Sequence, residues 1–334
     1  MIRVGIVGFG YMGRMHYRCW SALEGVRITA ACDADAKAFT SSNAASGNIS
    51  GAANDIDLAG IRTFTSFDDL LTSGAVDVVS ITLPTHMHPA FTIKALAAGM
   101  HVLCEKPMAL TLEDCDRMIA AAAQYKRLLQ IGHCIRFWPE YVATRELVRS
   151  GEFGRVIGAA FHRYSPMPAW STVNWLADEK RSGGMPLDLH IHDADFIHYL
   201  FGMPRSVMSV GDSAMSHIHT TFLYDNGPVV SAEASWRTAP SLGFSMGFRI
   251  TLEKATVVFD SLRAPAFRVY PHEGEPFTPP LVEGDGYSGE IVHFAEKIRG
   301  VTTEDVITLD QSRETVRLVL AEKESVRRGS PVDL

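Results

Sequence analysis

Residues 2–13 read IRVGIVGFGYMG, and this stretch decides the fold of the first part of the chain. The apolar run IRVGIV leads into Gly8, Gly10 and Gly13, which have G-x-G-x-x-G spacing. A helix-like segment and a second strand-like run, VRITAAC, come next. In such a unit the glycines allow a tight turn, close approach of the backbone to a pyrophosphate, and close packing of helix on strand. The order of these segments predicts a dinucleotide-binding βαβ unit, whereas the glycines alone would indicate only a tight turn.

Asp33 follows the second strand, 20 residues after Gly13. An acidic side chain at this point can hold the hydroxyls of the adenosine ribose, and it would repel a 2′-phosphate. The N-terminus of the intervening helix offers N–H donors and a positive dipole to the phosphates. We therefore expect NAD in preference to NADP. The residues expected to contact it here are Gly8, Phe9, Gly10, Tyr11, Met12, Gly13 and Asp33.

Strand-like and helix-like segments continue to alternate up to about residue 132. The strand-like runs VDVVSITLP, HVLCE and RLLQIGH are separated by helices that start at Pro89 and Thr111. This alternation predicts an α/β fold with a Rossmann-type, doubly wound parallel sheet over residues 1–132. Ligands of such sheets bind beyond the carboxyl ends of the strands. Further cofactor contacts are accordingly expected from Thr82, Pro84, His88, Glu105 and Lys106.

Residues 133–334 follow a different pattern, with many strand-like runs between turns and two closing helices. The Asp-Asn-Gly at 225–227 is a hairpin signal. We expect an α+β domain with a large, mostly antiparallel, open sheet. Because an open sheet exposes one face, a homodimer or homotetramer through this C-terminal sheet is the simplest solution.

Composition limits the class of protein. The net charge of −7 gives no attraction to nucleic acid or to an anionic membrane. The five cysteines have no CxxC spacing, which indicates reduced thiols in the cytoplasm. Neither a signal peptide nor a membrane-spanning run is apparent. Residues 41–60 are small and polar, and a long surface loop or a frayed helix end is expected there.

The stretch GGMPLDLHIHDADFIHYLFG at 183–202 is the richest in titratable groups. It carries three histidines and three aspartates, namely His190, His192, His198, Asp188, Asp193 and Asp195. One interpretation is a metal site, because imidazole and carboxylate are common zinc and iron ligands. The other is an acid/base pair formed by Asp188 and His192, which lie four residues apart and would share one face of a helix.

Four motifs together resemble the glucose–fructose oxidoreductase/inositol dehydrogenase/MocA family of NAD(P)-dependent oxidoreductases, and the similarity covers essentially the whole chain. They are GFGYMG near the N-terminus, CEKP at 104–107, SGGMPLDLHIHDADFIHYLFG at 182–202 and EGDGYSGEIVHFAEKIRG at 283–300. The combination of EKP with a D-x-x-x-H helix is far more specific than the glycine motif.

The resemblance implies that Lys106, Asp188 and His192 form the catalytic set and that the substrate is a sugar, inositol or related polyol. In the family the histidine is the general acid/base, the aspartate orients the site, and the lysine hydrogen-bonds the reacting oxygen. This agrees with the chemistry of alcohol oxidation, which needs a base for the hydroxyl proton while the cofactor takes the hydride. No metal is then expected, and the HxH spacing is incidental.

Several residues flank this region and could shape a polyol pocket, although packing in the core or a surface salt bridge is the alternative for each. Arg136, Trp175 and His190 are the candidates for substrate contact, and Trp138, Trp170 and Arg181 lie near them in sequence.

Three other functions stay open from the sequence. A glycosidase of the same fold would use NAD transiently, without net NADH. A metal-dependent hydrolase would use the HxHD cluster. A non-catalytic sugar sensor would need none of Lys106, Asp188 and His192, and their presence argues against it.

Overall fold

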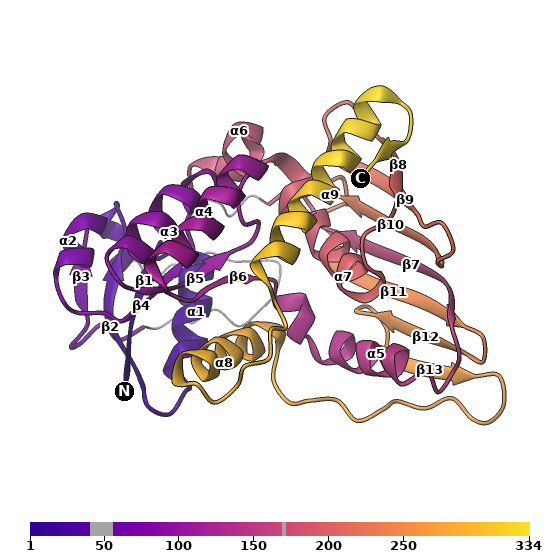
Figure 1. Ribbon diagram of the computed structural model, residues 1–334, viewed down its shortest axis with the longest axis horizontal. Coiled ribbons are helices and arrows are strands. Elements are labelled where there is room, and N and C mark those ends of the chain that lie inside the picture. Colours follow the sequence, from indigo (N-terminus) through magenta and orange to yellow (C-terminus); the bar gives the residue numbers. More distant parts are fainter. Residues whose placement is uncertain (41–55, 169–171) are drawn as a thin grey trace. The chain divides into compact units, whose positions relative to one another are not determined.

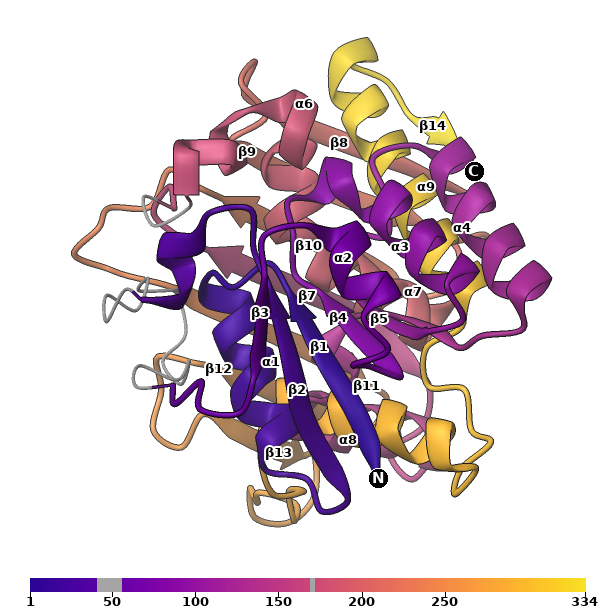
Figure 2. The same cartoon turned by 90° about the vertical axis from the view of Figure 1, so that its left-hand side faces the viewer.

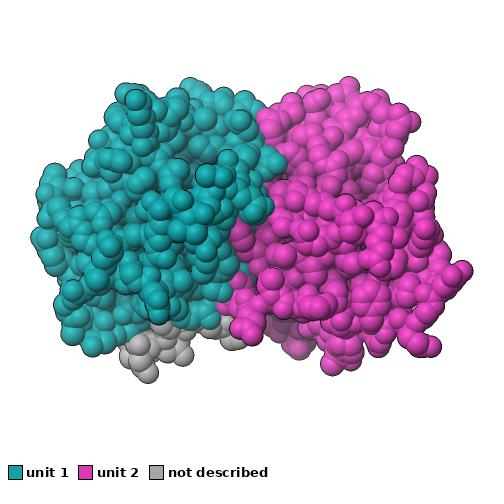
Figure 3. Space-filling model, turned by 60° about the horizontal axis from the view of Figure 1, so that its bottom comes forward, with its two compact units in different colours: residues 1–134, 169–182, 286–313 teal, residues 135–168, 183–285, 314–334 magenta. Residues whose placement is uncertain are grey.

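The computed structural model describes residues 1–40, 56–168 and 172–334, so most of the expected loop at 41–60 and Trp170 lie outside the described residues. The chain forms two compact units, each built from three segments (Figure 3). Unit 1 comprises Met1–Cys134, Ala169–Ser182 and Gly286–Arg313, and unit 2 comprises Ile135–Pro168, Gly183–Asp285 and Glu314–Leu334. The units therefore differ from a single division at residue 132, because two later segments pack with the first 134 residues.

Unit 1 contains a six-stranded sheet in the order β3-β2-β1-β4-β5-β6. Its strands are β1 (Ile2–Val7), β2 (Val26–Cys32), β3 (Arg62–Phe64), β4 (Val78–Ile81), β5 (His101–Glu105) and β6 (Leu129–Gly132). All neighbouring strands run parallel. The chain adds β2 and β3 on one side of β1, and then returns to add β4, β5 and β6 on the other side. This order confirms the predicted doubly wound sheet.

Helices cover both faces of this sheet (Figure 2). They are α1 (Tyr11–Ser21), α2 (Phe67–Thr72), α3 (His88–Ala97), α4 (Leu112–Tyr125) and α8 (Gly286–Arg299). Helices α1 and α8 pack against each other, and α3 packs against α4. The core under α1 and α8 joins Ile6, Met15 and Trp20 to Ile291 and Phe294, all of them fully buried. This shared core explains why α8 belongs to unit 1 although it lies late in the chain.

Unit 2 contains an eight-stranded sheet in the order β13-β12-β11-β7-β10-β9-β8-β14. Its strands are β7 (Val156–Tyr164), β8 (Ser206–Gly211), β9 (His217–Leu223), β10 (Val229–Ser235), β11 (Ser245–Leu252), β12 (Ala255–Asp260), β13 (Phe267–Pro271) and β14 (Val332–Asp333). Its strand pairs are antiparallel except β7 with β10. The predicted mostly antiparallel sheet is confirmed, and the Asp-Asn-Gly turn connects β9 to β10.

Within unit 2, helices lie against one face of the sheet (Figure 1). They are α5 (Pro139–Ser150), α7 (Ile191–Phe201) and the part of α9 (Leu309–Arg328) from Glu314 onward. The ring of Tyr141 on α5 lies 4.8 Å from that of Phe196 on α7 and 5.0 Å from that of Phe248 on β11, edge to face in both cases. Among the described residues, no helix combines the length and the apolar character needed to cross a membrane.

Candidate active site

The glycine loop after β1 has the geometry that its spacing predicts. Gly8 has φ +90°, a conformation that suits glycine, and a Cβ built on Gly13 would lie 2.0 Å from the carbonyl oxygen of Gly8. A Cβ built on Gly10 meets no atom within 4 Å. Helix α1 begins directly afterwards with no side-chain cap on its first N–H groups. The loop therefore combines an approachable backbone with a helix N-terminus that has no side-chain cap, which fits a pyrophosphate.

Asp33 and Thr82 hold this loop from both sides. One carboxylate oxygen of Asp33, at the end of β2, accepts a hydrogen bond from the backbone N–H of Phe9 at 2.8 Å. The hydroxyl of Thr82, directly after β4, donates to the carbonyl of Gly8 at 2.7 Å. Both residues lie beyond the carboxyl ends of neighbouring strands, where the sequence predicts the ligand site.

His88 connects two loops at the same edge of the sheet. Its Nε2 lies 2.8 Å from the carbonyl of Leu83, and its Nδ1 lies 2.8 Å from the carbonyl of Pro107. Burial lowers the pKa of His88, although the two carbonyls oppose this shift. The ring is 1% exposed. This geometry indicates a residue that holds the 82–84 turn beside the Lys106–Pro107 segment, and direct contact with the cofactor stays a prediction.

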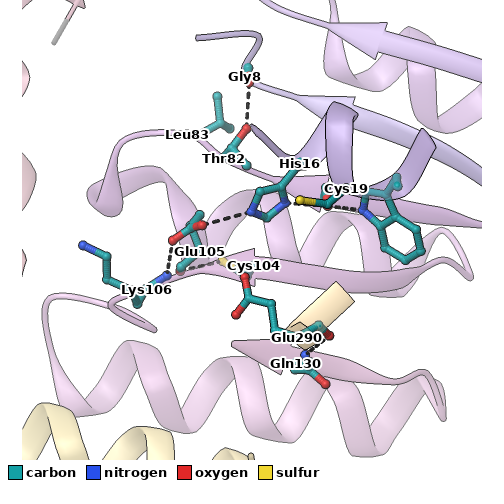
Figure 4. A network of polar contacts seen from close by, with 12 residues as sticks. Gly8, His16, Cys19, Thr82, Leu83, Cys104, Glu105, Lys106, Gln130 and Glu290 are labelled. Carbon is teal, nitrogen blue, oxygen red and sulfur yellow. Dashed lines mark hydrogen bonds and ion pairs between the residues drawn. The ribbon is translucent and has the colours of Figure 1, made fainter. Parts of the chain in front are cut away.

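Lys106 directly follows β5 and is partly exposed. Its backbone N–H donates to the carboxylate of Glu105 at 3.1 Å, and the peptide bond to Pro107 is cis. Glu105 points into the interior of unit 1, whereas the Lys106 side chain points away from it (Figure 4). These hydrogen bonds, together with the chain connections from Thr82 to Leu83 and from Lys106 to Pro107, place the glycine loop, His88 and Lys106 along one edge of unit 1.

The six titratable residues of the 183–202 stretch have different partners and different degrees of burial. Asp193 is fully buried and forms a two-pronged ion pair with Arg163 on β7, with both N–O distances 2.9 Å. Asp195 is paired in the same way with Arg136, at 2.8 and 2.7 Å, and also accepts from Thr315. These two aspartates therefore anchor α7 to its surroundings.

The histidines at 190 and 198 also have interior partners. Nε2 of His190 lies 2.6 Å from a carboxylate oxygen of Glu322 on α9, and that oxygen also accepts from Thr220. Burial alone would lower the pKa of His190, but the Glu322 carboxylate outweighs it and raises the pKa. Nδ1 of His198 lies 3.3 Å from the hydroxyl of Thr315. Both histidines contribute to packing on the C-terminal helix.

Asp188 and His192 remain partly exposed, unlike Asp193, Asp195 and His190. Asp188 lies in a π-helical turn, Pro186–His190, which leads directly into α7. Such turns occur frequently at functional sites because they change the direction in which side chains point. The sequence predicts a simple helical spacing for Asp188 and His192, and it carries no signal for this π turn.

The residues expected to contact substrate are placed as follows. Arg136 is 1% exposed, and its guanidinium carbon lies 4.3 Å from the centre of the Tyr199 ring. His190 is fully buried against Glu322. Trp175 is partly buried and belongs to unit 1, whereas Arg136 and His190 belong to unit 2. Direct contact of these three with substrate stays a prediction.

The HxH motif does not gather metal ligands in the described part of the chain. The group of potential ligands that comes together there is His16, Glu105 and Glu290, whose ligand atoms lie within 4.8 Å of one another. All three are buried in unit 1. Sequence reasoning missed this group because its members are far apart in the chain and belong to no short motif.

Two sequence patterns of one protein family match the chain. The pattern described as "Oxidoreductase family, NAD-binding Rossmann fold" matches residues 2–133, and the "GFO/IDH/MocA C-terminal domain" matches residues 141–258. Together they include the glycine loop, Lys106, Asp188 and His192.

Individual proteins agree with this. The chain is 30% identical over 211 residues to a 2,7-anhydro-N-acetylneuraminate hydratase of Mediterraneibacter gnavus, covering 62% of this chain and 51% of the relative. It is 29% identical over 224 residues to an inositol 2-dehydrogenase of Salmonella paratyphi B, covering 66% and 60%. Matches to the first curated relatives thus span about half of their length.

A solved structure shares the fold over the whole chain. The WlbA dehydrogenase of Bordetella pertussis, in complex with NADH and UDP-GlcNAcA, has a TM-score of 0.85 and 21% identity, and the match covers 100% of this chain and 97% of that one.

Proposed function

Because the chain belongs to the GFO/IDH/MocA family of oxidoreductases with an NAD-binding Rossmann fold, we propose that it transfers a hydride between NAD and a hydroxyl-bearing carbon of a sugar, inositol or related polyol. The observation that carries this proposal is the sorting of the 183–202 stretch. Asp193, Asp195 and His190 are buried in ion pairs, whereas Asp188, His192 and His198 are partly exposed. Of these three, Asp188 and His192 form the D-x-x-x-H pair.

The proposed roles follow from the chemistry of alcohol oxidation. His192 accepts the hydroxyl proton, because an imidazole exchanges protons near neutral pH. Asp188 orients His192, and the Lys106 ammonium stabilises the developing alkoxide. Bound NAD supplies the hydride acceptor at the nicotinamide.

NAD rather than NADP is the proposed cofactor. The support is Asp33, whose carboxylate lies at the end of β2 beside the glycine loop, where a 2′-phosphate would meet a negative charge. A reaction that uses NAD without net NADH production is the second candidate. It is favoured by the 30% identity to a relative named as a hydratase of an anhydro sugar.

Two further proposals concern the enzyme as a whole. We place it in the cytoplasm, on the support of five cysteines that are all buried and free of disulfides. We also propose a homodimer or homotetramer through the face of the unit 2 sheet that unit 2's own helices leave uncovered.

The test is turnover with a panel of inositols, sugars and their acids, followed as NADH absorbance and, in parallel, as product by mass spectrometry. His192→Gln and Lys106→Met are expected to lower kcat/KM by about 10²–10⁴-fold. The control is His198→Gln on the same helix, which should stay near the wild-type rate. Full turnover in both catalytic variants would overturn the assignment, and product without NADH would select the second candidate.

A further inference from the structure

A buried chain of hydrogen bonds runs from α1 to the residue that precedes Lys106 (Figure 4). Nε2 of His16 on α1 lies 3.0 Å from one carboxylate oxygen of Glu105, and the other oxygen accepts the backbone N–H of Lys106 at 3.1 Å. Nδ1 of His16 lies 2.9 Å from the hydroxyl of Ser80 on β4. The exposed fractions are 0% for His16, 0% for Ser80 and 7% for Glu105.

The Glu105 carboxylate fixes the direction of this chain. An ionised carboxylate can only accept, so the ring proton of His16 lies on Nε2 and is donated to Glu105. The Ser80 hydroxyl accepts the indole Nε1–H of Trp20 at 3.0 Å and can donate its own proton to Nδ1 of His16. Both oxygens of Glu105 thus accept N–H groups, one from His16 and one from Lys106.

Two of these side chains, His16 and Glu105, are also possible metal ligands together with Glu290. A metal ion would need Nε2 of His16 and an oxygen of Glu105 as ligands, and these two atoms already bond to each other at 3.0 Å. His16 and Glu105 thus have matching hydrogen-bond partners without an ion. The hydrogen-bonded arrangement therefore accounts for these two residues.

We propose that His16 is a positioning residue for Lys106, acting through Glu105. It connects the helix whose first turn faces the proposed pyrophosphate site to the backbone that carries the proposed catalytic lysine. Glu105 can hold the Lys106 N–H only while it is itself held, because a buried carboxylate without its second donor is costly. This inference rests on the proposed function.

The charge state of Glu105 gives a pH-dependent test of this positioning role. Burial alone would raise the pKa of Glu105, but the hydrogen bond from His16 and the nearby positive charges outweigh it and lower the pKa. Glu105 is therefore ionised, and holds both donors, down to a pH below its usual range. The titratable groups that face it from neighbouring elements are His16 on α1, His88 on α3, Tyr287 and Glu290 on α8, and Cys104 and Lys106 beside it in the chain.

The test compares two substitutions of one residue in the full-length chain. His16→Asn keeps a polar group near Ser80 but is too short to reach Glu105, whereas His16→Gln can reach Glu105 with an amide N–H. His16→Asn is expected to lower kcat by about 10–100-fold with NADH affinity within about threefold of wild type. His16→Gln should recover most of the rate. The control is His101→Gln, at the opposite end of β5, where the ring accepts the backbone N–H of Leu128.

The pH profile separates positioning from a general structural effect. Without the His16 bond Glu105 takes up a proton more readily, so the acid-side loss of kcat/KM should begin at higher pH in His16→Asn than in wild type. A merely structural defect would lower the rate equally at all pH values. If thermal melting shows that His16→Asn is not folded, Glu105→Gln is used in its place. That variant should show a similar loss of kcat but no acid limb from residue 105, because an amide does not titrate.

If the wild-type enzyme is active, four outcomes would overturn the inference. They are an unchanged rate and pH profile in His16→Asn, an equal loss in His101→Gln, a loss confined to NADH affinity, and a bound metal whose removal by EDTA abolishes turnover. A wild-type protein that binds NADH but converts no member of the panel would instead contradict the proposed function.

Discussion

Asp33 is the residue on which the proposed choice of cofactor depends. Its two carboxylate oxygens accept the backbone N–H groups of Phe9 and Asp35. We expect Asp33→Asn to keep an acceptor for the loop while it removes the charge that opposes a 2′-phosphate. The ratio of kcat/KM for NADP to that for NAD should rise by about tenfold or more, corresponding to about 1.4 kcal/mol.

The matched control is Asp35→Asn, two residues further on, whose side chain caps a short helical turn through the N–H of Lys37. It should leave the ratio unchanged. An unchanged ratio in Asp33→Asn as well would show that another group selects the cofactor.

At the scale of single residues, the sequence predicts what short motifs encode and little beyond them. Gly8, Gly13 and Asp33 have the positions that their spacing indicates, because the turn and the strand end are local features. The partners of His16 and His190 could not be foreseen. Glu105 lies 89 residues from His16 and Glu322 lies 132 residues from His190, so only the folded sheet and helices bring them together.

Within the glycine loop, Gly10 and Gly13 should respond differently to the same substitution. In Gly13→Ala the added carbon would lie 2.0 Å from the carbonyl oxygen of Gly8, so the turn must distort and the thermal midpoint should fall by several degrees. In Gly10→Ala the added carbon meets no protein atom within 4 Å. That variant should melt like wild type and yet bind NADH about tenfold or more weakly, because the carbon occupies the approach to the pyrophosphate.

Thermal melting and NADH titration of both variants check this prediction. Equal losses of NADH affinity and stability in the two variants would indicate that the loop has only a structural role.

Helix α7 depends on the buried pair between Asp193 and Arg163. The side chains are 0% and 3% exposed, so Asp193→Asn leaves the Arg163 guanidinium without its counter-charge in the interior. We expect the free energy of unfolding of unit 2 to fall by about 3–5 kcal/mol, measured by urea unfolding. Glu253→Gln removes one partner of the exposed pair with Arg155 and should change stability little. Equal effects in the two variants would contradict a role for burial.

At the scale of elements, the alternation of strands and helices predicts the parallel sheet, and the strand-like runs between turns predict the antiparallel one. The rest depends on packing between distant segments. β3 has only three residues, none of them buried, so no apolar run marks it. The parallel pairing of β7 with β10 and the addition of α8 to unit 1 are long-range choices. The local pattern of apolar residues cannot predict these contacts, because it indicates which residues are buried and not which element they pack against.

For the whole molecule, the proposed self-association depends on the outward face of the unit 2 sheet. Alternate residues of β9 and β10 point away from the helices, among them Thr221 and Ser231, which lie opposite each other on neighbouring strands. Thr221 and Ser231 are partly exposed and uncharged, and the charged Glu233 on the same face lies 3.3 Å from Nε2 of His217. A second copy could cover this face without burying an unpaired ion at its centre.

Ser231→Lys should therefore dissociate the assembly, because the ammonium would have to lose its water at the middle of the interface. Light scattering at micromolar concentration should show wild type as a dimer or tetramer and Ser231→Lys with a lower mass, while its melting curve stays close to wild type. Ala97→Lys, at the exposed end of α3, adds the same charge elsewhere and should leave the mass unchanged. A monomeric wild type, or an unchanged mass in Ser231→Lys, would exclude this face as the contact between copies.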